Sequence, residues 1–211
     1  MDAALIPVKE LTRAKSRLAG DFDDAARLEI ARALLDDALG LALSAPFFTW
    51  WVVTADAEVA GAAGARGLRT TADPGGGLNT ALDAGIAAAA AEGATSVTIV
   101  PCDVPLAFRG DLEDLRDTGA TSDVVLVPSG DDGGTNALYL SPPGLVTPRF
   151  GEGSLKSHLA AAEERGVRCS ILALPRLALD IDTVEDVDAF LAWPRRFPSR
   201  TGDVLERLRP A

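Results

Sequence analysis

Short apolar runs alternate with longer amphipathic segments along most of the chain. Residues 24–43 carry apolar side chains at helical spacing, and residues 96–100 form a largely β-branched run of the kind that is buried on both faces of a sheet. A helix over residues 78–92 is expected to end at Gly93, because glycine tolerates the left-handed conformation of a helix C-terminus. The patterns predict strands at residues 4–7, 50–54, 67–71, 96–100, 123–128, 136–140 and 169–174, and helices at residues 24–43, 55–65, 78–92, 154–165 and 183–193.

Strands that alternate with helices predict an α/β domain with a mostly parallel sheet flanked by helices. Ligands of such sheets bind where the strands end. The turn-rich segment SGDDGGT (129–135) lies between two strands and predicts one antiparallel excursion, so the sheet is expected to be mixed. We expect one domain over residues 1–193, followed by a loosely attached Pro/Arg-rich tail over residues 194–211.

Composition narrows the function classes. A chain of 211 residues with a formal charge of −11 fits one globular domain and disfavours nucleic acid as a partner, because neutralising phosphates needs an excess of Lys and Arg. Cys102 and Cys169 have no metal-ligand or disulfide spacing. The first residues lack the pattern of a signal peptide, and the Ala-rich run at 81–91 is too short to span a membrane. We therefore expect a cytoplasmic protein without a membrane partner.

A cluster of cations follows the first predicted strand. Lys9, Arg13, Lys15 and Arg17 lie within nine residues of an otherwise acidic chain. Their position at the end of the first strand favours a site that binds a triphosphate group, and a solvated basic turn is the alternative. The segment matches neither a P-loop nor a GxGxxG fingerprint.

A glycine-rich loop precedes the helix at 78–92. The sequence DPGGGLNTAL (73–82) lets the backbone approach a ligand at a helix N-terminus, where anions are favoured. A plain flexible loop is an equally good interpretation of the glycines alone.

Three aspartates follow the pattern of a hard-cation site. Asp103 comes directly after the strand at 96–100, between Pro101 and Pro105. Asp180 and Asp182 are two residues apart, so their side chains project to the same side of an extended segment and could share a cation with Asp103. Helix caps or solvated turns are the alternatives.

Two further segments, GGTNAL (133–138) and FGEGSLKSH (150–158), combine hydroxyls, a helix start and Lys156, which suits a carboxylate or phosphate. Ser154 is a candidate helix N-cap, and Thr183 with Asp186 forms a second capping pair. The single histidine, His158, is more typical of a hydrogen-bonded structural residue than of a catalyst. No motif for a covalent nucleophile is present.

Taken in order, IPVKELTRAKSRLAG, PGGGLNTAL, PCDVPL, GGTNAL, FGEGSLKSH and LDIDT resemble the CofC/FbiD family. Those proteins are guanylyltransferases of coenzyme F-420 biosynthesis with a single-domain, GT-A-like nucleotidyltransferase fold. The resemblance runs from residue 5 to about residue 190. It implies that Asp103 and Lys15 are catalytic.

The resemblance also implies the ligands of the remaining positions. It assigns Mg²⁺ to Asp103, Asp180 and Asp182. It assigns the phosphorylated acid to Thr135, Gly151 and Ser154. Contacts to GTP are expected from Lys9, Lys15, Arg17, Gly75, Gly76, Gly77 and Asn79.

The expected reaction is GMP transfer from GTP to phosphoenolpyruvate, which releases pyrophosphate and gives enolpyruvyl-diphospho-guanosine. The same reaction on 2-phospho-L-lactate or 3-phospho-D-glycerate is the alternative within the family, and a catalytically silent GTP-binding protein is the alternative of another class. A molybdenum-cofactor guanylyltransferase is disfavoured, because the first strand lacks an LAGG-type phosphate loop. A homodimer, through Trp50 and Trp51 or the tail, is compatible with the sequence.

Overall fold

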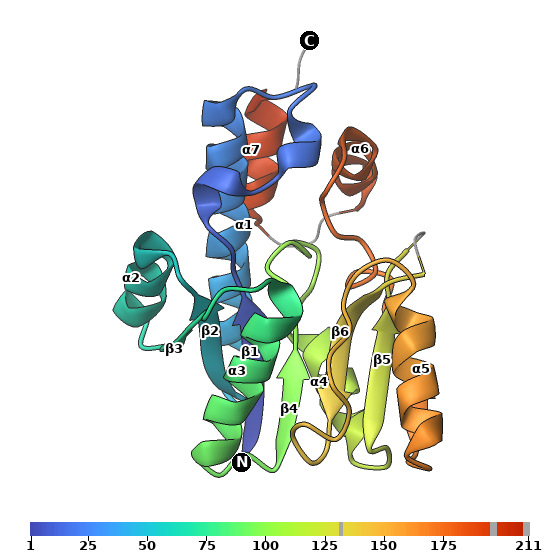
Figure 1. Ribbon diagram of the computed structural model, residues 1–211. Helices are drawn as coiled ribbons and strands as arrows, with labels where there is room; N and C mark the ends of the chain where they lie inside the picture. The colour runs from blue at the N-terminus through green and yellow to red at the C-terminus, as the bar shows by residue number, and fades with distance from the viewer. Residues whose placement is uncertain (131–132, 195–197, 209–211) are drawn as a thin grey trace.

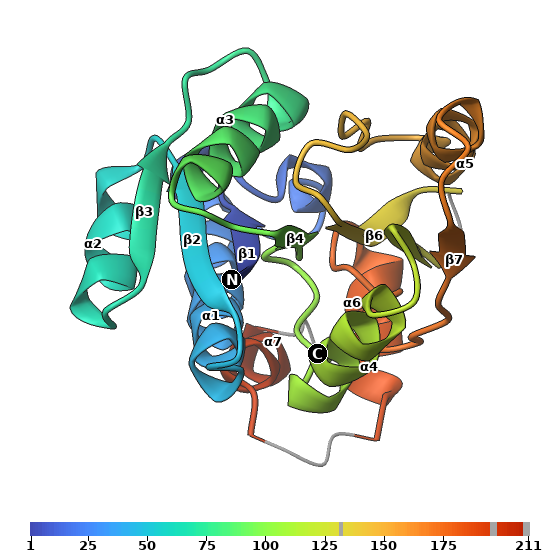
Figure 2. The ribbon, with the colours of Figure 1, turned by 90° about the horizontal axis from the view of Figure 1, so that it is seen from below.

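The computed structural model describes residues 1–130, 133–194 and 198–208, and within them seven strands form one sheet. The strand order is β3-β2-β1-β4-β6-β5-β7 (Figures 1 and 2). The strands are β1 Asp2–Pro7, β2 Thr49–Thr54, β3 Arg69–Ala72, β4 Ser96–Ile99, β5 Val124–Pro128, β6 Thr135–Leu140 and β7 Cys169–Ile171. The predicted mixed α/β sheet is confirmed, with boundaries that differ by one to three residues.

Strand β6 runs against its two neighbours, β4 and β5, whereas the other strand pairs are parallel. The predicted antiparallel excursion is therefore confirmed, although residues 131–132 of its turn lie outside the described residues. Because β6 is reversed, its first residue, Thr135, lies at the edge where the parallel strands end. This topology delivers an additional segment to the edge at which ligands of such sheets bind.

Helices cover both faces of the sheet (Figure 2). Apolar residues of α1, α2 and α4 form a core with one face, and those of α3 and α5 form a core with the other. The helices are α1 Asp24–Ser44, α2 Ala57–Ala65, α3 Leu78–Ala91, α4 Arg109–Gly119, α5 Ser154–Glu164, α6 Val184–Ala192 and α7 Arg200–Leu208. Two 3₁₀ turns, η1 Leu11–Arg13 and η2 Ser16–Leu18, follow β1. Among the described residues, no helix combines the length and the apolar character that crossing a bilayer requires.

One of the two predicted helix caps is correct. The Thr183 hydroxyl accepts from the Asp186 N–H, and the Thr183 N–H donates to the Asp186 carboxylate at 2.7 Å, which is the expected reciprocal pair. Ser154 is not an N-cap, because Gly153, with a φ of 66°, occupies that position and Ser154 is the first helical residue. The Ser154 hydroxyl is buried and has no hydrogen-bond partner among the described residues.

Helix α4 was not predicted, and it anchors the segment that leads into α6. Its apolar face consists mainly of Leu112 and Leu115, so charged residues dominate its sequence. Asp111 on this helix is fully buried and accepts two hydrogen bonds from the Arg176 guanidinium, at 3.1 and 2.7 Å. The Arg176 guanidinium also lies 4.3 Å from the centre of the Phe108 ring.

Residues 198–208 differ from the expected loosely attached tail, because Arg200–Leu208 form α7, which lies along α1 (Figure 1). Val204 and Leu205 are buried in a core shared with Leu34 and Phe190. The Asp37 carboxylate of α1 accepts hydrogen bonds from the side chain and backbone at the start of α7. Residues 195–197 and 209–211 of the same stretch lie outside the described residues.

The two tryptophans proposed as a dimer contact are core residues. Trp50 and Trp51 are 4% and 2% exposed and belong to the cores on opposite faces of the sheet. The Trp50 indole N–H donates to the backbone carbonyl of Ala45 at 3.0 Å. A homodimer would therefore have to use another surface.

The packing of α7 predicts a stability cost for Leu205→Ala. Because this side chain is fully buried, its truncation should lower the free energy of unfolding by about 2–5 kcal/mol. Asp203→Ala, on the exposed face of the same helix, should change it by no more than about 0.5 kcal/mol. Urea unfolding followed by circular dichroism measures both. Equal midpoints for Leu205→Ala and the parent chain would contradict the docking of α7.

Candidate active site

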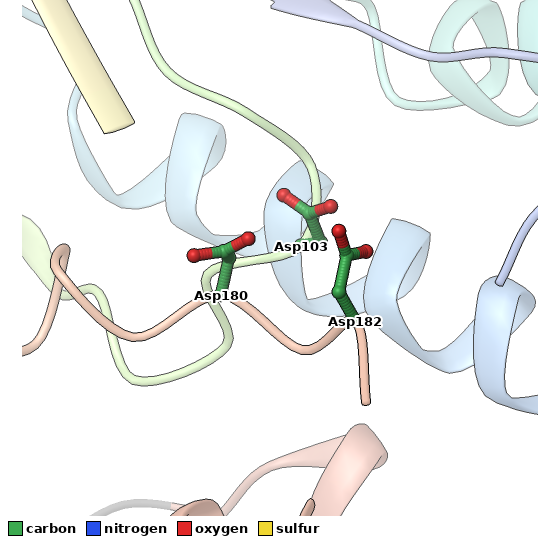
Figure 3. A group of neighbouring side chains, drawn as sticks. All are labelled: Asp103, Asp180 and Asp182. Carbon is green, nitrogen blue, oxygen red and sulfur yellow. The ribbon is translucent and has the colours of Figure 1, made fainter. Parts of the chain in front are cut away.

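Three carboxylates from two segments that lie far apart in the sequence converge at the edge of the sheet (Figure 3). Asp103 follows β4, and Asp180 and Asp182 lie between β7 and α6. One oxygen from each lies within 4.8 Å of the other two. The Ile181 N–H donates to the Asp103 carbonyl at 3.0 Å, which holds the two segments together. The predicted grouping of these aspartates is thus present in the structure.

The Lys15 ammonium lies between two of these carboxylates. Its Nζ donates to Asp103 Oδ2 at 2.8 Å and to Asp182 Oδ1 at 3.1 Å, and the side chain is only 8% exposed. Burial alone would lower the pKa of Lys15, but the attraction of both carboxylates outweighs it, so the pKa lies above its ordinary value. The Arg17 guanidinium adds a more exposed contact to Asp182 at 3.2 Å.

Lys15 also has an unusual backbone. Its φ of 56° and ψ of 37° are left-handed, and it is the one non-glycine residue with positive φ among those described. This conformation costs a non-glycine residue about 1–2 kcal/mol. Residues in such conformations cluster at functional sites, and the side chain of Lys15 is held by its two ion pairs.

Asn136 positions the third carboxylate, a role that its sequence context as a strand residue does not predict. Its Nδ2 donates to Asp180 Oδ1 and to the Leu177 carbonyl, both at 2.9 Å. Burial raises the pKa of Asp180, and Asp103 and Asp182 raise it further, whereas the hydrogen bond from Asn136 lowers it. The arrangement therefore favours the ionised form of Asp180 most when a cation is close.

The donor set fits a hard divalent cation, because it consists of carboxylate oxygens at short mutual distances. The neighbouring Cys102 is a free thiol, and burial, with a smaller contribution from Asp103, raises its pKa to about 12. The group of possible ligands is thus made of carboxylates, which suit metals that prefer oxygen.

A pocket of about 450 Å³ adjoins the carboxylates. It is lined by cations from the segment after β1 and by Leu78, the first residue of α3. The structure thus brings the predicted basic segment to the carboxylates. The charged residues that line it are Lys9, Arg13, Lys15, Arg17, Asp103 and Asp182.

The glycine-rich loop directly precedes Leu78 in the sequence, but its three glycines are not among the residues that line the pocket. Gly75, Gly76 and Gly77 have φ values of 84°, 89° and 102°, which side chains rarely adopt, and all three are exposed. The Gly75 N–H donates to the Asp73 carboxylate at 2.8 Å. Contact between these glycines and a nucleotide stays a prediction.

Asn79 joins α3 to the loop before α5. Its Oδ1 accepts from the Phe150 N–H at 2.8 Å, and its Nδ2 donates to the Phe150 carbonyl at 3.2 Å. Both ends of the side-chain amide are therefore engaged within the protein. A contact of Asn79 with GTP also stays a prediction.

The three residues assigned to the phosphorylated acid lie along the contact between β6 and α5. Thr135 begins β6, and its hydroxyl is 3.1 Å from His158 on α5. The Gly151 carbonyl accepts from the Ser154 N–H at 3.1 Å, and the Leu155 N–H donates to the Gly133 carbonyl at 3.0 Å. These contacts gather two buried hydroxyls, of Thr135 and Ser154, at the sheet edge.

A protein-family model described as "Guanylyl transferase CofC like" matches residues 2–194. The chain belongs to this family. The resemblance inferred from the ordered motifs is therefore confirmed, and the match includes the three carboxylates, the basic segment and the residues assigned to the phosphorylated acid.

Curated members of the CofC family carry three acceptor names. A phosphoenolpyruvate guanylyltransferase of Rubrobacter xylanophilus is 38% identical, over 87% of this chain and 90% of its own. A 3-phospho-D-glycerate guanylyltransferase of Phenylobacterium zucineum is 36% identical, over 99% and 97%. A 2-phospho-L-lactate guanylyltransferase of Methanothermobacter thermautotrophicus is 36% identical, over 87% and 81%.

Solved structures place this CofC-family chain in the nucleotidyltransferase fold. A Desulfovibrio desulfuricans G20 protein assigned as a nucleotide-diphospho-sugar transferase has a TM-score of 0.81 at 18% identity, over 98% of this chain and 94% of its own. A manganese complex of a Mycobacterium tuberculosis protein has a TM-score of 0.55 at 18% identity, over 90% and 97%. At these identities the likeness establishes the fold alone.

The carboxylate group predicts where a divalent cation binds. Asp103→Asn and Asp180→Asn should each weaken Mn²⁺ binding at least about tenfold, because each removes one charged ligand. The signal of free Mn²⁺ in electron paramagnetic resonance measures the affinity. Asp83→Asn, an exposed carboxylate on α3, serves as the matched control and should bind as the parent does. Unchanged affinity in both site variants would exclude this cluster as the cation site.

Proposed function

We propose that the protein transfers GMP from GTP to phosphoenolpyruvate, releases pyrophosphate, and forms enolpyruvyl-diphospho-guanosine in coenzyme F-420 biosynthesis. The observation that carries this proposal is the convergence of Asp103, Asp180 and Asp182 with Lys15 beside a cation-lined pocket, in a chain of the CofC family. Charged groups of both signs at one sheet edge suit a reaction between two phosphorylated substrates.

The proposed chemistry needs no general base. A phosphate monoester is largely ionised near pH 7, since its second pKa is about 6. One of its oxygens attacks the α-phosphorus of GTP, and a new P–O bond forms there. The bond from the α-phosphorus to the oxygen that bridges to the β-phosphorus breaks, and pyrophosphate leaves with that electron pair. The protein therefore has to align two anions and neutralise their charge.

The residues of this chain divide that task. Lys15 and Arg17, together with Lys9 at the pocket wall, carry the positive charge that attracts the triphosphate. Asn136 keeps Asp180 in place for a cation. We propose that the metal is Mg²⁺, which would supply charge neutralisation of the phosphates when bound to the three aspartates.

The choice of phosphoenolpyruvate as acceptor is supported by relatives. Six relatives at 35–38% identity bear that name. The 2-phospho-L-lactate and 3-phospho-D-glycerate enzymes, at 36% each, keep the same reaction on those acids as the alternative. All three acceptors combine a phosphate and a carboxylate, so the hydroxyls of Thr135 and Ser154 suit each of them.

We further propose that the enzyme works in the cytoplasm, where GTP is present. Cys102 and Cys169 are free thiols, as a reducing compartment keeps them. A catalytically silent GTP-binding protein is the alternative of another class, and it would bind GTP without metal-dependent turnover.

Pyrophosphate release from GTP and Mg²⁺ should require phosphoenolpyruvate. Each of the three phosphorylated acids is offered separately, with ATP in place of GTP as the nucleotide control. Release is expected with phosphoenolpyruvate and GTP, and slower or no release with the other pairs. A preference for another acid would replace the acceptor and keep the reaction. GTP binding without release in any mixture would support the silent alternative.

The Lys15→Gln variant tests whether the Lys15 ammonium neutralises charge during turnover. Loss of the ammonium should lower kcat/KM by roughly 10²–10³-fold, as removal of one preorganised donor does in other enzymes. Mn²⁺ binding by the free protein should become tighter, because Lys15 no longer competes for Asp103 and Asp182. Arg165→Gln, exposed at the end of α5, is the control for a lost cation. Parent-like turnover in Lys15→Gln would remove Lys15 from the mechanism.

A further inference from the structure

The single histidine of the chain connects the segments that carry the proposed acceptor site. His158 lies on α5 and is fully buried. Its Nδ1 is 3.1 Å from the Thr135 hydroxyl, and its Nε2 accepts from the Arg149 N–H at 2.9 Å. The ring also packs edge-on against Phe150, with centroids 5.4 Å apart. One imidazole thus touches both the start of β6 and the loop before α5.

The backbone contact fixes the position of the imidazole proton. An N–H group only donates, so Nε2 must be the unprotonated acceptor. Burial, with a smaller contribution from the charge of Arg149, lowers the pKa of His158 to about 4, so the ring is neutral near pH 7. The proton therefore lies on Nδ1, which donates to Thr135 Oγ1.

This assignment determines what the Thr135 hydroxyl does. Its oxygen accepts from His158, so its hydrogen is available to donate to another acceptor. The hydroxyl makes no other hydrogen bond among the described residues. Ser154 lies four residues before His158, on the same face of α5, and its buried hydroxyl is also without a partner in the described chain. The hydroxyls of Thr135 and Ser154, at the starts of β6 and α5, can thus each donate a hydrogen bond to a ligand.

We propose that His158 is a positioning residue of the acceptor site, which holds the Thr135 hydroxyl as a donor to an anionic group of the phosphorylated acid. This inference rests on the proposed function. Through Nε2 the same ring holds the backbone at Arg149, next to Phe150 and Gly151. His158 itself exchanges no proton with substrate.

Two conservative variants of His158 distinguish the role of Nδ1 from that of Nε2. In His158→Asn the side-chain amide can replace Nδ1 as donor to Thr135, and in His158→Gln it can replace Nε2 as acceptor for Arg149. His158→Gln should raise the KM for phosphoenolpyruvate by roughly 10- to 100-fold, the range for one hydrogen bond to a charged group. Its KM for GTP should stay within about twofold of the parent, and His158→Asn should recover most of the acceptor affinity.

A double-mutant cycle with Thr135→Val tests whether His158 acts through this hydroxyl. In the Thr135→Val background, His158→Gln should cause no further rise in the KM for phosphoenolpyruvate. Effects that add, or equal changes in the KM values for both substrates with a lowered Tm, would assign His158 a purely structural role and overturn the proposal.

Imidazole ¹⁵N NMR tests the hydrogen bond without turnover, because the chain has one histidine to observe. A neutral Nδ1–H tautomer is expected at pH 7, and phosphoenolpyruvate should shift the Nδ1–H signal as the Thr135 hydroxyl becomes a donor to the anion. The other tautomer, an imidazolium, or a signal that phosphoenolpyruvate leaves unmoved would overturn the proposal. Absence of pyrophosphate release by the parent, with the expected tautomer and shift, would instead reject only the proposed reaction.

Discussion

Three carboxylates whose oxygens lie within 4.8 Å repel one another, and the rest of the site is arranged around that repulsion. The Lys15 ammonium lies between two of them and holds the turn after β1 against the segments that follow β4 and β7. Asn136 supplies a neutral donor to the third, Asp180. The convergence of three distant segments at one sheet edge thus depends on charge compensation as much as on apolar packing.

The reversed strand β6 separates two tasks on its two faces. Successive residues of a strand point to opposite sides, so Thr135 faces α5 and His158, whereas Asn136 faces Asp180 and the Leu177 carbonyl. Antiparallel β6 begins at the edge where the parallel strands end, so one dipeptide contributes to the proposed acceptor side and to the carboxylate side.

Sequence patterns predicted the sheet and most helices, because buried β-branched runs and long apolar stripes leave clear periodicity. The grouping of the aspartates was predicted from the position of Asp103 after a strand and from the spacing of Asp180 and Asp182. Helix α4 was missed because two leucines carry its apolar face among charged residues. The Pro/Arg-rich composition of residues 194–211 gave no sign that α7 packs on the domain, because its burial depends on Leu34 and Phe190 from other elements. The sequence around Asn136 is that of an ordinary strand residue, so its contact with Asp180 was not predicted. Left-handed Gly153 occupies the N-cap position that was predicted for Ser154. For α7 and Asn136, tertiary contacts decided the outcome.

The charges around Lys15 bear on how a nucleotide and a divalent cation would bind together. The three carboxylates of Asp103, Asp180 and Asp182 outnumber the two cations that contact them, Lys15 and Arg17, whereas Lys9 and Arg13 line the adjoining pocket. A divalent cation held by the three carboxylates would offset their charge and weaken their attraction for Lys15, whose ammonium would then be available to a phosphate oxygen. Under the proposed function, a nucleotide that arrives with its metal would therefore meet less negative charge at the carboxylates than a bare nucleotide would. Metal dependence would therefore appear in nucleotide binding as well as in the chemical step.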